Sequence, residues 1–453
     1  MTPAPRSGPR RRVAFLSEHA SPLALLGGAD AGGQNVYVDE VARGLGRLGY
    51  AVDVFTRREA ADAPTVTPWA HGVRVVNLPA GPARVLPKDD LWPHMPTLRD
   101  ALRGFAAREG ARYDLIHGNF WMSGWAACEL ARTTAAPVVQ IFHATGKTKQ
   151  REQGAADTSP AERIAVELDV VRRADALIAQ CPEEERELVE DYAAAPGKVA
   201  VIPSAVDTTR FRPEDKAEAR RRLGLPQDEP VVVYVGRMLP RKDVRNVVRA
   251  LAELNRRPGA GEALPLLLLV GGETREPDEV TTPEIGALRR LAEDLGVADR
   301  VRFIGRRQPD ELRWCYAAGD VAVTTPWYEP FGLTPLEAMA CGRPVIGSAV
   351  GGIAFTVADG ETGLLVPPRD PEALAADLRA LLGDPARRER MGHAARDRVE
   401  ANFTWRTVAE RTAALYESLL DRRQAVRAGA APDPDALAWL PTTPAVQHEE
   451  RSA

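Results

Sequence analysis

The stretch Thr324–Val345, TTPWYEPFGLTPLEAMACGRPV, holds a loop acid, a turn, a helix start and the beginning of a buried strand within a short span. The apolar residues before it predict a strand that leads into the loop carrying Glu329. Thr334 suits a helix N-cap, Pro335 the first helical position, and Glu337 the third. The order of strand, loop, helix and strand is typical of a parallel α/β sheet.

Two interpretations of the acids in this stretch are open. Glu337 fits the acid of a Thr-x-x-Glu capping box, with Glu329 as a solvated loop acid. Alternatively, both carboxylates bind ligand hydroxyl groups, while the free N–H groups and the dipole of the helix start attract phosphate. Gly332 would then let the ligand approach the backbone, because glycine carries no Cβ.

The run EPFGLTPLEAMACGRPV, from Glu329 to Val345, resembles the Glu-x7-Glu signature of glycosyltransferase family 4. These are retaining enzymes of the GT-B fold that use nucleotide-sugar donors. The resemblance implies that Glu329 contacts the transferred sugar and that Glu337 contacts the nucleotide ribose. It also implies that the intervening turn lies at the donor, through Phe331, Gly332 and Leu333.

Composition excludes several classes of protein. With 453 residues, of which 44% are hydrophobic and 27% charged, the chain is long enough for two or three domains with sizeable cores. A formal net charge of -4 argues against general nucleic-acid binding. The four cysteines lack C-x-x-C spacing, and no apolar run has the length of a membrane span. We therefore expect a reduced, cytoplasmic enzyme without stable membrane insertion.

Apolar strands that alternate with helical patterns predict an α/β fold. We expect two Rossmann-like doubly wound domains that face each other across a cleft, the GT-B arrangement. The predicted segments are a disordered tail over 1–11, an N-terminal acceptor domain over 12–205, a C-terminal donor domain over 206–400, a helix over 401–423 that crosses back to the first domain, and a disordered tail over 424–453.

Polar residues follow several strands of the first domain. A glycine-rich loop that ends with Gly32 and Gly33 separates the first strand from the first helix, where backbone N–H groups can approach a phosphate. A plain surface loop is the alternative. His19, His117 and His143 lie at the ends of three different strands. Because ligands gather beyond the carboxyl ends of parallel strands, these histidines predict a shared pocket.

The second domain opens with the apolar run VVVYV, directly followed by Gly236 and Arg237, with Lys242 shortly after. Two cations at a strand end can offset a diphosphate and stabilise it as a leaving group, although a solvated turn is the plain alternative. Their spacing resembles that of the family's Arg and Lys that grip the donor phosphates. The segment around Arg306 resembles the family's base-contacting segment.

The N-terminal half resembles the sucrose-phosphate-synthase-like and mycothiol-glycosyltransferase-like branch of the family. The similar stretches are Gly32–Val38, Ala80–Pro93 and His117–His143. The resemblance implies that the glycine loop meets the donor diphosphate and that His143 lies at the transferred sugar. Residues expected at a phosphorylated acceptor are Lys88, Phe120, Thr145, Lys147 and Arg163. Phe120 stands where the mycothiol branch has a tyrosine, so one hydroxyl contact is missing.

These patterns predict a hexosyltransferase that needs no cofactor and no metal. The only D-x-D match, Asp433–Asp435, lies in the tail, so Arg237, Lys242, the glycine loop and the helix start must meet the diphosphate charge. The partners would be a nucleotide-diphosphate sugar and a hydroxyl acceptor that carries a phosphate, such as a sugar phosphate or a cyclitol phosphate. The resemblance implies retention of configuration, with a donor phosphate oxygen taking the acceptor proton. A homodimer is left open.

Three other functions share this two-domain plan. A sugar-nucleotide sensor would bind the donor without transfer, and a phosphorylase would need a lysine-bound pyridoxal phosphate. A nucleotide-sugar 2-epimerase would act on the donor alone.

Overall fold

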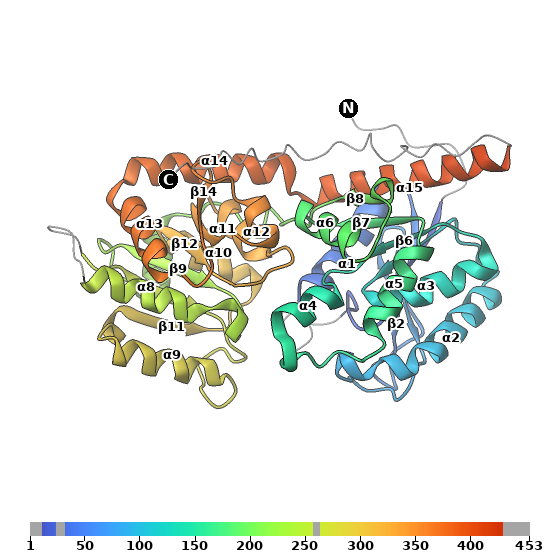
Figure 1. Cartoon of the computed structure of the whole chain (residues 1–453), viewed down its shortest axis with the longest axis horizontal. Helices are drawn as coiled ribbons and strands as arrows, with labels where there is room; N and C mark the ends of the chain where they lie inside the picture. The colour runs from blue at the N-terminus through green and yellow to red at the C-terminus, as the bar shows by residue number, and fades with distance from the viewer. Residues whose placement is uncertain (1–10, 24–31, 257–262, 429–453) are drawn as a thin grey trace. The chain divides into compact units, whose positions relative to one another are not determined.

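The computed structural model describes residues 11–23, 32–256 and 263–428, and these residues form two compact units (Figure 1). Unit 1 comprises the chain up to Pro203 together with the segment from Trp405, and unit 2 comprises Ser204–Thr404. Each unit contains one sheet with helices on both faces. The prediction of two parallel α/β domains is therefore confirmed.

The sheet of unit 1 has the strand order β3-β4-β2-β1-β5-β6-β7-β8. All neighbouring strands run parallel except β3, which pairs antiparallel with β4 at the edge. The strands are β1 (Arg12–Leu16), β2 (Ala51–Arg57), β3 (Val66–Ala70), β4 (Val73–Leu78), β5 (Leu115–Asn119), β6 (Val138–Ile141), β7 (Ala176–Ala179) and β8 (Val199–Val201).

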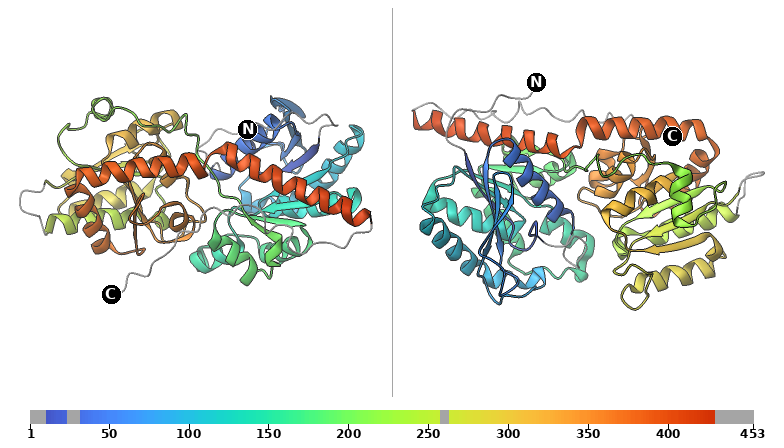
Figure 2. Two further views of the ribbon diagram at one scale, coloured as in Figure 1. Left: turned by 90° about the horizontal axis from the view of Figure 1, so that it is seen from above. Right: turned by 180° about the vertical axis from the view of Figure 1, so that it is seen from behind.

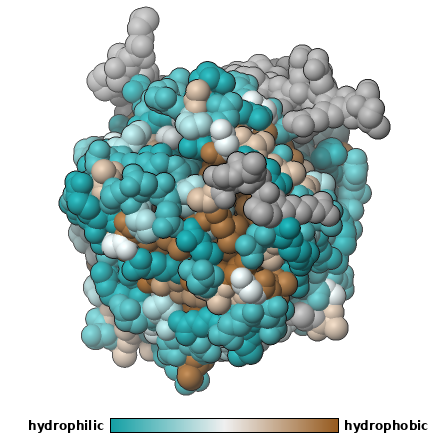
Figure 3. Space-filling model, turned by 90° about the vertical axis from the view of Figure 1, so that its left-hand side faces the viewer, coloured by the Kyte–Doolittle hydropathy of each residue, from teal (hydrophilic) through white to brown (hydrophobic). Residues whose placement is uncertain are grey.

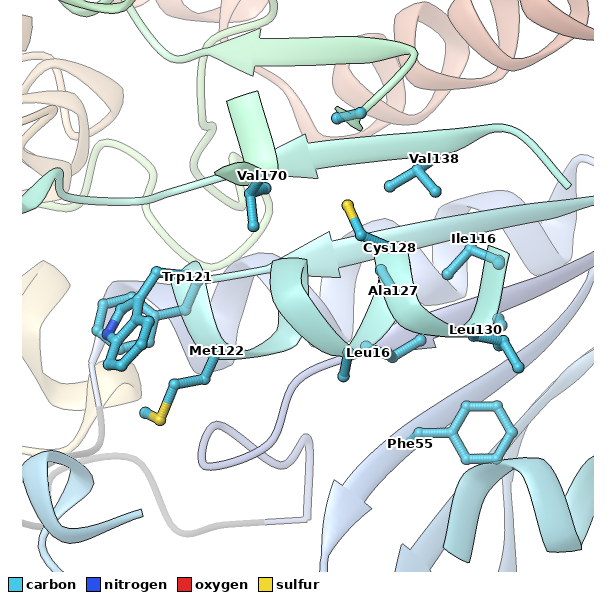
Figure 4. Close-up of a cluster of buried hydrophobic side chains, with 14 of the residues drawn as sticks. Leu16, Phe55, Ile116, Trp121, Met122, Ala127, Cys128, Leu130, Val138 and Val170 are labelled. Atoms are coloured by element: carbon cyan, nitrogen blue, oxygen red, sulfur yellow. The ribbon is translucent and has the colours of Figure 1, made fainter. Parts of the chain in front are cut away.

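The core of unit 1 forms where α3 packs on the sheet. Figure 4 shows Ala127 and Leu130 of this helix near Ile116 of β5, and Val138 of β6 lies in the same buried cluster. The helices are α1 (Gly33–Arg47), α2 (Met95–Arg108), α3 (Trp121–Thr134), α4 (Gly146–Gln153), α5 (Arg163–Arg173), α6 (Pro182–Glu190) and α15 (Trp405–Arg427), with short turns η1 (Lys88–Asp90), η2 (Trp92–His94), η3 (Gly154–Ala156) and η4 (Pro196–Lys198).

The C-terminal helix α15, drawn in red, packs against α1 (Figures 1 and 2). The two helices approach closely at Gly44, where an added Cβ would overlap the Cβ of Ala409. Since α15 extends to Arg427, it passes the predicted start of the tail at residue 424. The predicted tails at 1–10 and 429–453 lie outside the described residues.

The sheet of unit 2 is fully parallel, with the order β11-β10-β9-β12-β13-β14. Its strands are β9 (Val231–Val235), β10 (Leu266–Val270), β11 (Val301–Gly305), β12 (Val321–Thr324), β13 (Val345–Ser348) and β14 (Gly363–Val366). Its helices are α7 (Lys216–Leu223), α8 (Val244–Arg256), α9 (Pro283–Asp294), α10 (Pro309–Ala318), α11 (Leu333–Ala340), α12 (Gly351–Thr356), α13 (Pro371–Gly383) and α14 (Pro385–Asn402), with turns η5 (Pro240–Lys242) and η6 (Ala298–Arg300).

The face that Figure 3 shows is largely hydrophilic, with an apolar region near its middle. This is the surface expected of a chain with 27% charged residues. Across the described ranges, no helix combines the length and the apolar character needed to cross a membrane.

Candidate active site

The strand order of unit 2 reverses at β9, because β10 and β11 lie on one side of it and β12 lies on the other. In open α/β sheets, ligands bind beyond the carboxyl ends of the strands at such a switch point. Lys242 follows β9 in the turn η5, and Glu329 follows β12. The topology thus brings together two predicted site residues that are far apart in sequence.

Glu329 and Lys242 form an ion pair between Oε2 and Nζ. Nη1 of Arg241 lies 3.7 Å from the same carboxylate oxygen. The side chains of Lys242 and Glu329 are only 15% and 11% exposed. Burial alone would raise the pKa of Glu329, but Lys242 and Arg241 outweigh burial and hold this pKa below its usual value. Glu329 is therefore an ionised carboxylate between two cations.

Arg237 contributes a third positive charge. Burial lowers the pKa of Lys242, Glu329 opposes this effect, and the charges of Arg241 and Arg237 lower the pKa further. Arg237 is exposed at the end of β9. We refer to the three cations Arg237, Arg241 and Lys242, together with the carboxylate of Glu329 that they surround, as the cation group. Three cations around one carboxylate leave an excess of positive charge, which suits a diphosphate.

At the ends of β9, β10 and β11, glycines let neighbouring backbone segments approach each other closely. The N–H of Gly236 donates to the backbone of β10 at 3.0 Å, and the N–H of Gly271 donates to the carbonyl of Gly305 at 3.0 Å. A Cβ on Gly271 would overlap the carbonyl oxygen of Gly236. Arg306 follows β11 directly, and its N–H donates to the neighbouring loop at 2.8 Å. These strand ends therefore form a fixed backbone platform beside the cation group.

The loop that carries Glu329 is held by the start of α12. A Cβ on Gly351 would overlap the carbonyl oxygen of Glu329, and one on Gly352 would overlap the backbone of Phe331. The N–H of Gly352 also donates to the Glu329 carbonyl at 3.3 Å. Gly332 ends the loop with φ 84°, a conformation that favours glycine. Phe331, in the same loop, is buried.

The helix start differs from the prediction. Helix α11 begins at Leu333 with Gly332 as its N-cap, and no side chain caps it. Thr334 is thus inside the first turn, so the prediction of Thr334 as the N-cap is wrong, and of the two interpretations of Glu337 the capping box is excluded. Glu337 instead accepts a hydrogen bond from the hydroxyl of Tyr316 on α10 at 2.8 Å. Burial raises the pKa of Glu337 to about 7, although this hydrogen bond opposes the shift.

In unit 1, the strand order reverses at β1, because β2 and β4 lie on one side and β5 lies on the other. The predicted glycine loop is described only from Gly32, since residues 24–31 lie outside the described ranges. The N–H of Gly32 donates to Oδ1 of Asn35 at 3.0 Å, and Gly33 is the first residue of α1. Both glycines therefore lie at a helix N-terminus.

His143 follows β6 in a left-handed conformation with φ 61°, which is uncommon for a residue with a side chain. Its Nε2 lies 3.2 Å from Oδ1 of Asn119, and the ring of Tyr37 packs edge-on against it at 4.9 Å. Burial, and then the charge of His19, lower the pKa of His143 to about 3. The imidazole is therefore neutral at pH 7.

Arg163 is the most strongly fixed of the predicted acceptor residues. It is 2% exposed and donates to Glu167 at 2.8 Å and to the carbonyl of Ala144 at 2.7 Å. Its guanidinium lies over the ring of Phe120, 5.0 Å from the centroid. The structure therefore brings Arg163 and Phe120 together, and it orders the guanidinium before any ligand binds.

Thr145 and Lys147 lie at the start of α4. The hydroxyl of Thr145 donates to Glu187, so it does not cap the helix. The N–H of Lys147 donates to the hydroxyl of Tyr192 at 2.8 Å, and its Nζ contacts the carbonyl of Asp191. Lys88 opens the turn η1. Asp89, next to Lys88, accepts a hydrogen bond from Thr158 at 2.6 Å, so this turn lies against the segment that follows α4.

His117 is more deeply buried than the other two histidines, although the charge of His143 is the second cause, after burial, of its lowered pKa. It is fully buried inside β5, its Nδ1 lies 2.6 Å from the hydroxyl of Tyr416 on α15, and burial lowers its pKa to about 3. The expectation of a pocket shared by three histidines is wrong for His117, because its ring turns into the core rather than toward the strand end.

Sequence reasoning also missed residues that shape the site. Glu167 orders Arg163 from one helical turn away, a spacing that could have signalled the pair. Gly351 and Gly352 were not predicted to contact the loop that carries Glu329. Tyr316, which bonds to Glu337, gave no signal because buried tyrosines on helices are ordinary core residues. Within the described ranges, no group of His, Cys, Asp and Glu could hold a metal ion, and Asp433–Asp435 lies outside them.

Comparison with known proteins identifies both units. Residues 31–210 match the family model described as Glycosyltransferase Family 4, and residues 215–398 match that described as Glycosyl transferases group 1. The chain is 42% identical over 424 residues to a D-inositol 3-phosphate glycosyltransferase of Acidothermus cellulolyticus, covering 92% of each chain.

Two solved structures of known proteins resemble the structure of this chain. A sucrose-phosphate synthase of Thermosynechococcus elongatus superposes with a TM-score of 0.80 at 37% identity, covering 91% of this chain and 100% of that one. HepE of Anabaena, in complex with UDP and glucose, shares the fold, with a TM-score of 0.68 at 20% identity over 90% of this chain and all of HepE.

The family matches and the named relatives identify the chain as a glycosyltransferase, and its two parallel α/β units have the GT-B fold. The chain belongs to glycosyltransferase family 4, and its second unit is the group 1 domain of that family. The protein is therefore an enzyme, and the predicted class and family are confirmed.

Proposed function

We propose that this enzyme transfers a hexose, with retention of configuration and without a metal ion, from a nucleotide-diphosphate sugar to a hydroxyl group of a cyclitol phosphate. The single observation that carries the donor half of the proposal is the cation group at the switch point of unit 2. A sugar-binding carboxylate there is already held by Lys242, and Arg241 and Arg237 supply the further charge that a departing diphosphate needs.

The proposed roles at the donor follow from these contacts. Lys242, Arg237 and the N-terminus of α11 bind the diphosphate oxygens, with the backbone at Gly236 and Gly332 close by. Glu329 accepts hydrogen bonds from sugar hydroxyl groups. Glu337 binds the ribose hydroxyls, and Arg306, Phe331 and Leu333 contact the nucleotide through their backbones. On unit 1, Gly32 and Gly33 approach the diphosphate and neutral His143 contacts the sugar.

A cyclitol phosphate acceptor is supported by the relatives, which are named D-inositol 3-phosphate glycosyltransferases and match over most of the chain. Arg163 is buried and pre-ordered, so it loses little freedom when it binds a phosphate. We assign Lys88, Lys147 and Thr145 to the same phosphate. Phe120 supplies an apolar surface beneath Arg163 in place of a hydroxyl contact.

In the proposed reaction, the acceptor hydroxyl attacks the anomeric carbon on the face that the diphosphate leaves. The bond from the acceptor oxygen to the anomeric carbon forms as the bond to the diphosphate oxygen breaks. The hydroxyl proton passes to an oxygen of the leaving phosphate, whose growing charge the cation group stabilises. The proposed reaction uses Glu329 as a hydrogen-bond acceptor and not as a nucleophile, and the ion pairs with Lys242 and Arg241 lower the nucleophilicity of its carboxylate.

Two features of the cellular form belong to the proposal. A cytoplasmic location agrees with the four cysteines, which are all buried thiols without a disulfide. Assembly into a homodimer stays a prediction, which light scattering of the purified chain would test.

The function is tested by incubating the enzyme with UDP-, GDP- and ADP-hexoses, each in the presence of inositol 3-phosphate or of hexose 6-phosphates. Mass spectrometry should find one glycosylated inositol phosphate and the matching nucleoside diphosphate. Transfer only to a hexose phosphate would overturn the cyclitol assignment. Epimerised donor without transfer would overturn the proposal itself.

A further inference from the structure

Protein carboxylates already accept hydrogen bonds from the start of α4, where the proposed function places the phosphate of the acceptor. The N–H of Gly146 donates to Oε2 of Glu167 at 2.8 Å. The hydroxyl of Thr145, a residue that is only 2% exposed, donates to the carboxylate of Glu187. A phosphate that binds at this helix start therefore competes with acidic groups of the protein itself.

Glu187 lies on α6 and is half-buried. Its Oε1 accepts hydrogen bonds from the hydroxyl groups of both Thr145 and Thr148. A hydroxyl group has one proton, so Thr145 can donate either to this carboxylate or to a phosphate oxygen, but not to both. An ionised carboxylate holds the hydroxyl more strongly than a protonated one, because hydrogen bonds to charged groups are about twice as strong as neutral ones. Protonation of Glu187 therefore frees Thr145 for a ligand.

The surroundings of Glu187 favour this protonation. Burial raises the pKa of Glu187 to about 7, and the charges of Asp191 and Glu167 also raise it, whereas the hydrogen bond from Thr145 and the charge of Arg151 lower it. Arg151 is itself paired with Asp191. The other charged and titratable groups around Glu187 are Glu184, Tyr192, and Lys147, whose Nζ contacts the carbonyl of Asp191. Both protonation states of Glu187 are therefore populated near neutral pH.

We infer that Glu187 determines the specificity for the acceptor, because its carboxylate competes with the acceptor phosphate for the hydroxyl of Thr145. The enzyme then binds a phosphorylated acceptor more tightly when Glu187 carries a proton, and binding of the phosphate draws a proton onto Glu187. The inference rests on the proposed function, since it concerns the phosphate that we assign to Thr145. It adds a dependence of acceptor affinity on pH.

The kinetic test compares wild type with Glu187→Gln between pH 7 and pH 9, where the phosphate of inositol 3-phosphate stays a dianion. If the competition changes the affinity about tenfold, the acceptor KM of wild type should rise about fivefold over this range. Glu187→Gln keeps an oxygen for both hydroxyl groups but has no charge. Its KM should not depend on pH and should be about tenfold below that of wild type at pH 9. Thr145→Val should have a raised KM that varies little with pH, since the shared hydroxyl is gone.

Two further variants separate this competition from a purely structural role. Glu190→Gln is the matched control, because Glu190 is an exposed acid of the same helix and the variant loses the same charge. It should keep the wild-type KM at every pH. Thr148→Val removes one of the two hydrogen bonds to the carboxylate, so the rise in KM should move to higher pH. If Glu187→Gln instead changed the KM by the same factor at every pH, the inference would be wrong.

Calorimetry on wild type gives a second test that does not need a folded Glu187→Gln. Inositol 3-phosphate is titrated at pH 8, with the nucleoside diphosphate product present, in two buffers that differ in their enthalpy of ionisation. A tenfold preference for the protonated form of a group that titrates near pH 7 predicts uptake of about 0.4 proton per acceptor bound. Release of protons, or binding without proton exchange, would overturn the inference.

The outcomes differ for the two proposals. If wild type transfers sugar to inositol 3-phosphate with the same acceptor KM from pH 7 to pH 9, Glu187 does not compete with the phosphate and only this inference fails. If wild type neither binds a nucleoside diphosphate nor transfers sugar, the proposed function fails and the inference fails with it.

Discussion

Replacing Lys242 by alanine should abolish most transfer while leaving a folded protein. Two unit charges about 4 Å apart, at an effective dielectric constant of about 20, interact by about 4 kcal/mol. Losing one such contact to a leaving diphosphate would lower kcat/KM about 10³-fold. Stability should fall less, by about 2 kcal/mol, because Arg241 remains 3.7 Å from the buried Glu329 carboxylate.

The assay pairs initial transfer rates with urea denaturation. Lys216→Ala is a matched control, because Lys216 also contacts a buried acid of unit 2, Asp320, which lies just before β12 at the opposite end of that strand from Glu329. This control should lose stability but keep its transfer rate. The double variant Lys242→Ala, Glu329→Gln should regain stability, because no unpaired carboxylate is left, and stay inactive. Native turnover by Lys242→Ala would refute the role of the cation group.

Three further predictions follow from the contacts described above. Burial raises the pKa of Glu337 from 4.5 to about 7, so the stability gained by holding this proton is fully present below about pH 4.5 and is lost as the pH rises through 7. Urea titrations should show the free energy of unfolding of wild type falling by about 3 kcal/mol across that range, relative to Glu337→Gln. Gly352→Ala should reduce kcat/KM by about tenfold or more, since its Cβ would displace the loop that carries Glu329. Gly383→Ala, with open space around the new Cβ, should be active, and equal activities of the two variants would contradict this prediction. Arg163→Lys should raise the acceptor KM about tenfold without changing donor affinity, since lysine cannot contact both Glu167 and the carbonyl of Ala144. An unchanged acceptor KM would argue against the assignment of Arg163 to the acceptor phosphate.

Much of the fold could be predicted from the sequence, because buried parallel strands are short apolar runs with clear ends. The apolar run VVVYV that opens the second domain is the strand Val231–Val235, with the same bounds. The edge strand Val66–Ala70 was missed because it is half-buried, has no apolar run and contains Pro68. An edge strand tolerates proline, since one of its sides needs no ladder hydrogen bonds.

The site could be predicted only in part, and the failures share a cause. Glu337 was open to a capping interpretation because the pattern Thr-x-x-Glu is a local signal, whereas its bond to Tyr316 comes from another helix. His117 looked like a strand-end ligand because the sequence does not show which way a ring turns. Contacts that depend on topology leave no local pattern to read.

The most direct test of the central claim is to follow the transfer reaction by NMR in the presence of excess EDTA, with the donor and inositol 3-phosphate. The account predicts undiminished transfer and a product with the anomeric configuration of the donor, because the fixed cations of unit 2 replace a metal ion. A product of inverted configuration, or transfer that appears only when Mg²⁺ or Mn²⁺ is added in excess, would contradict it.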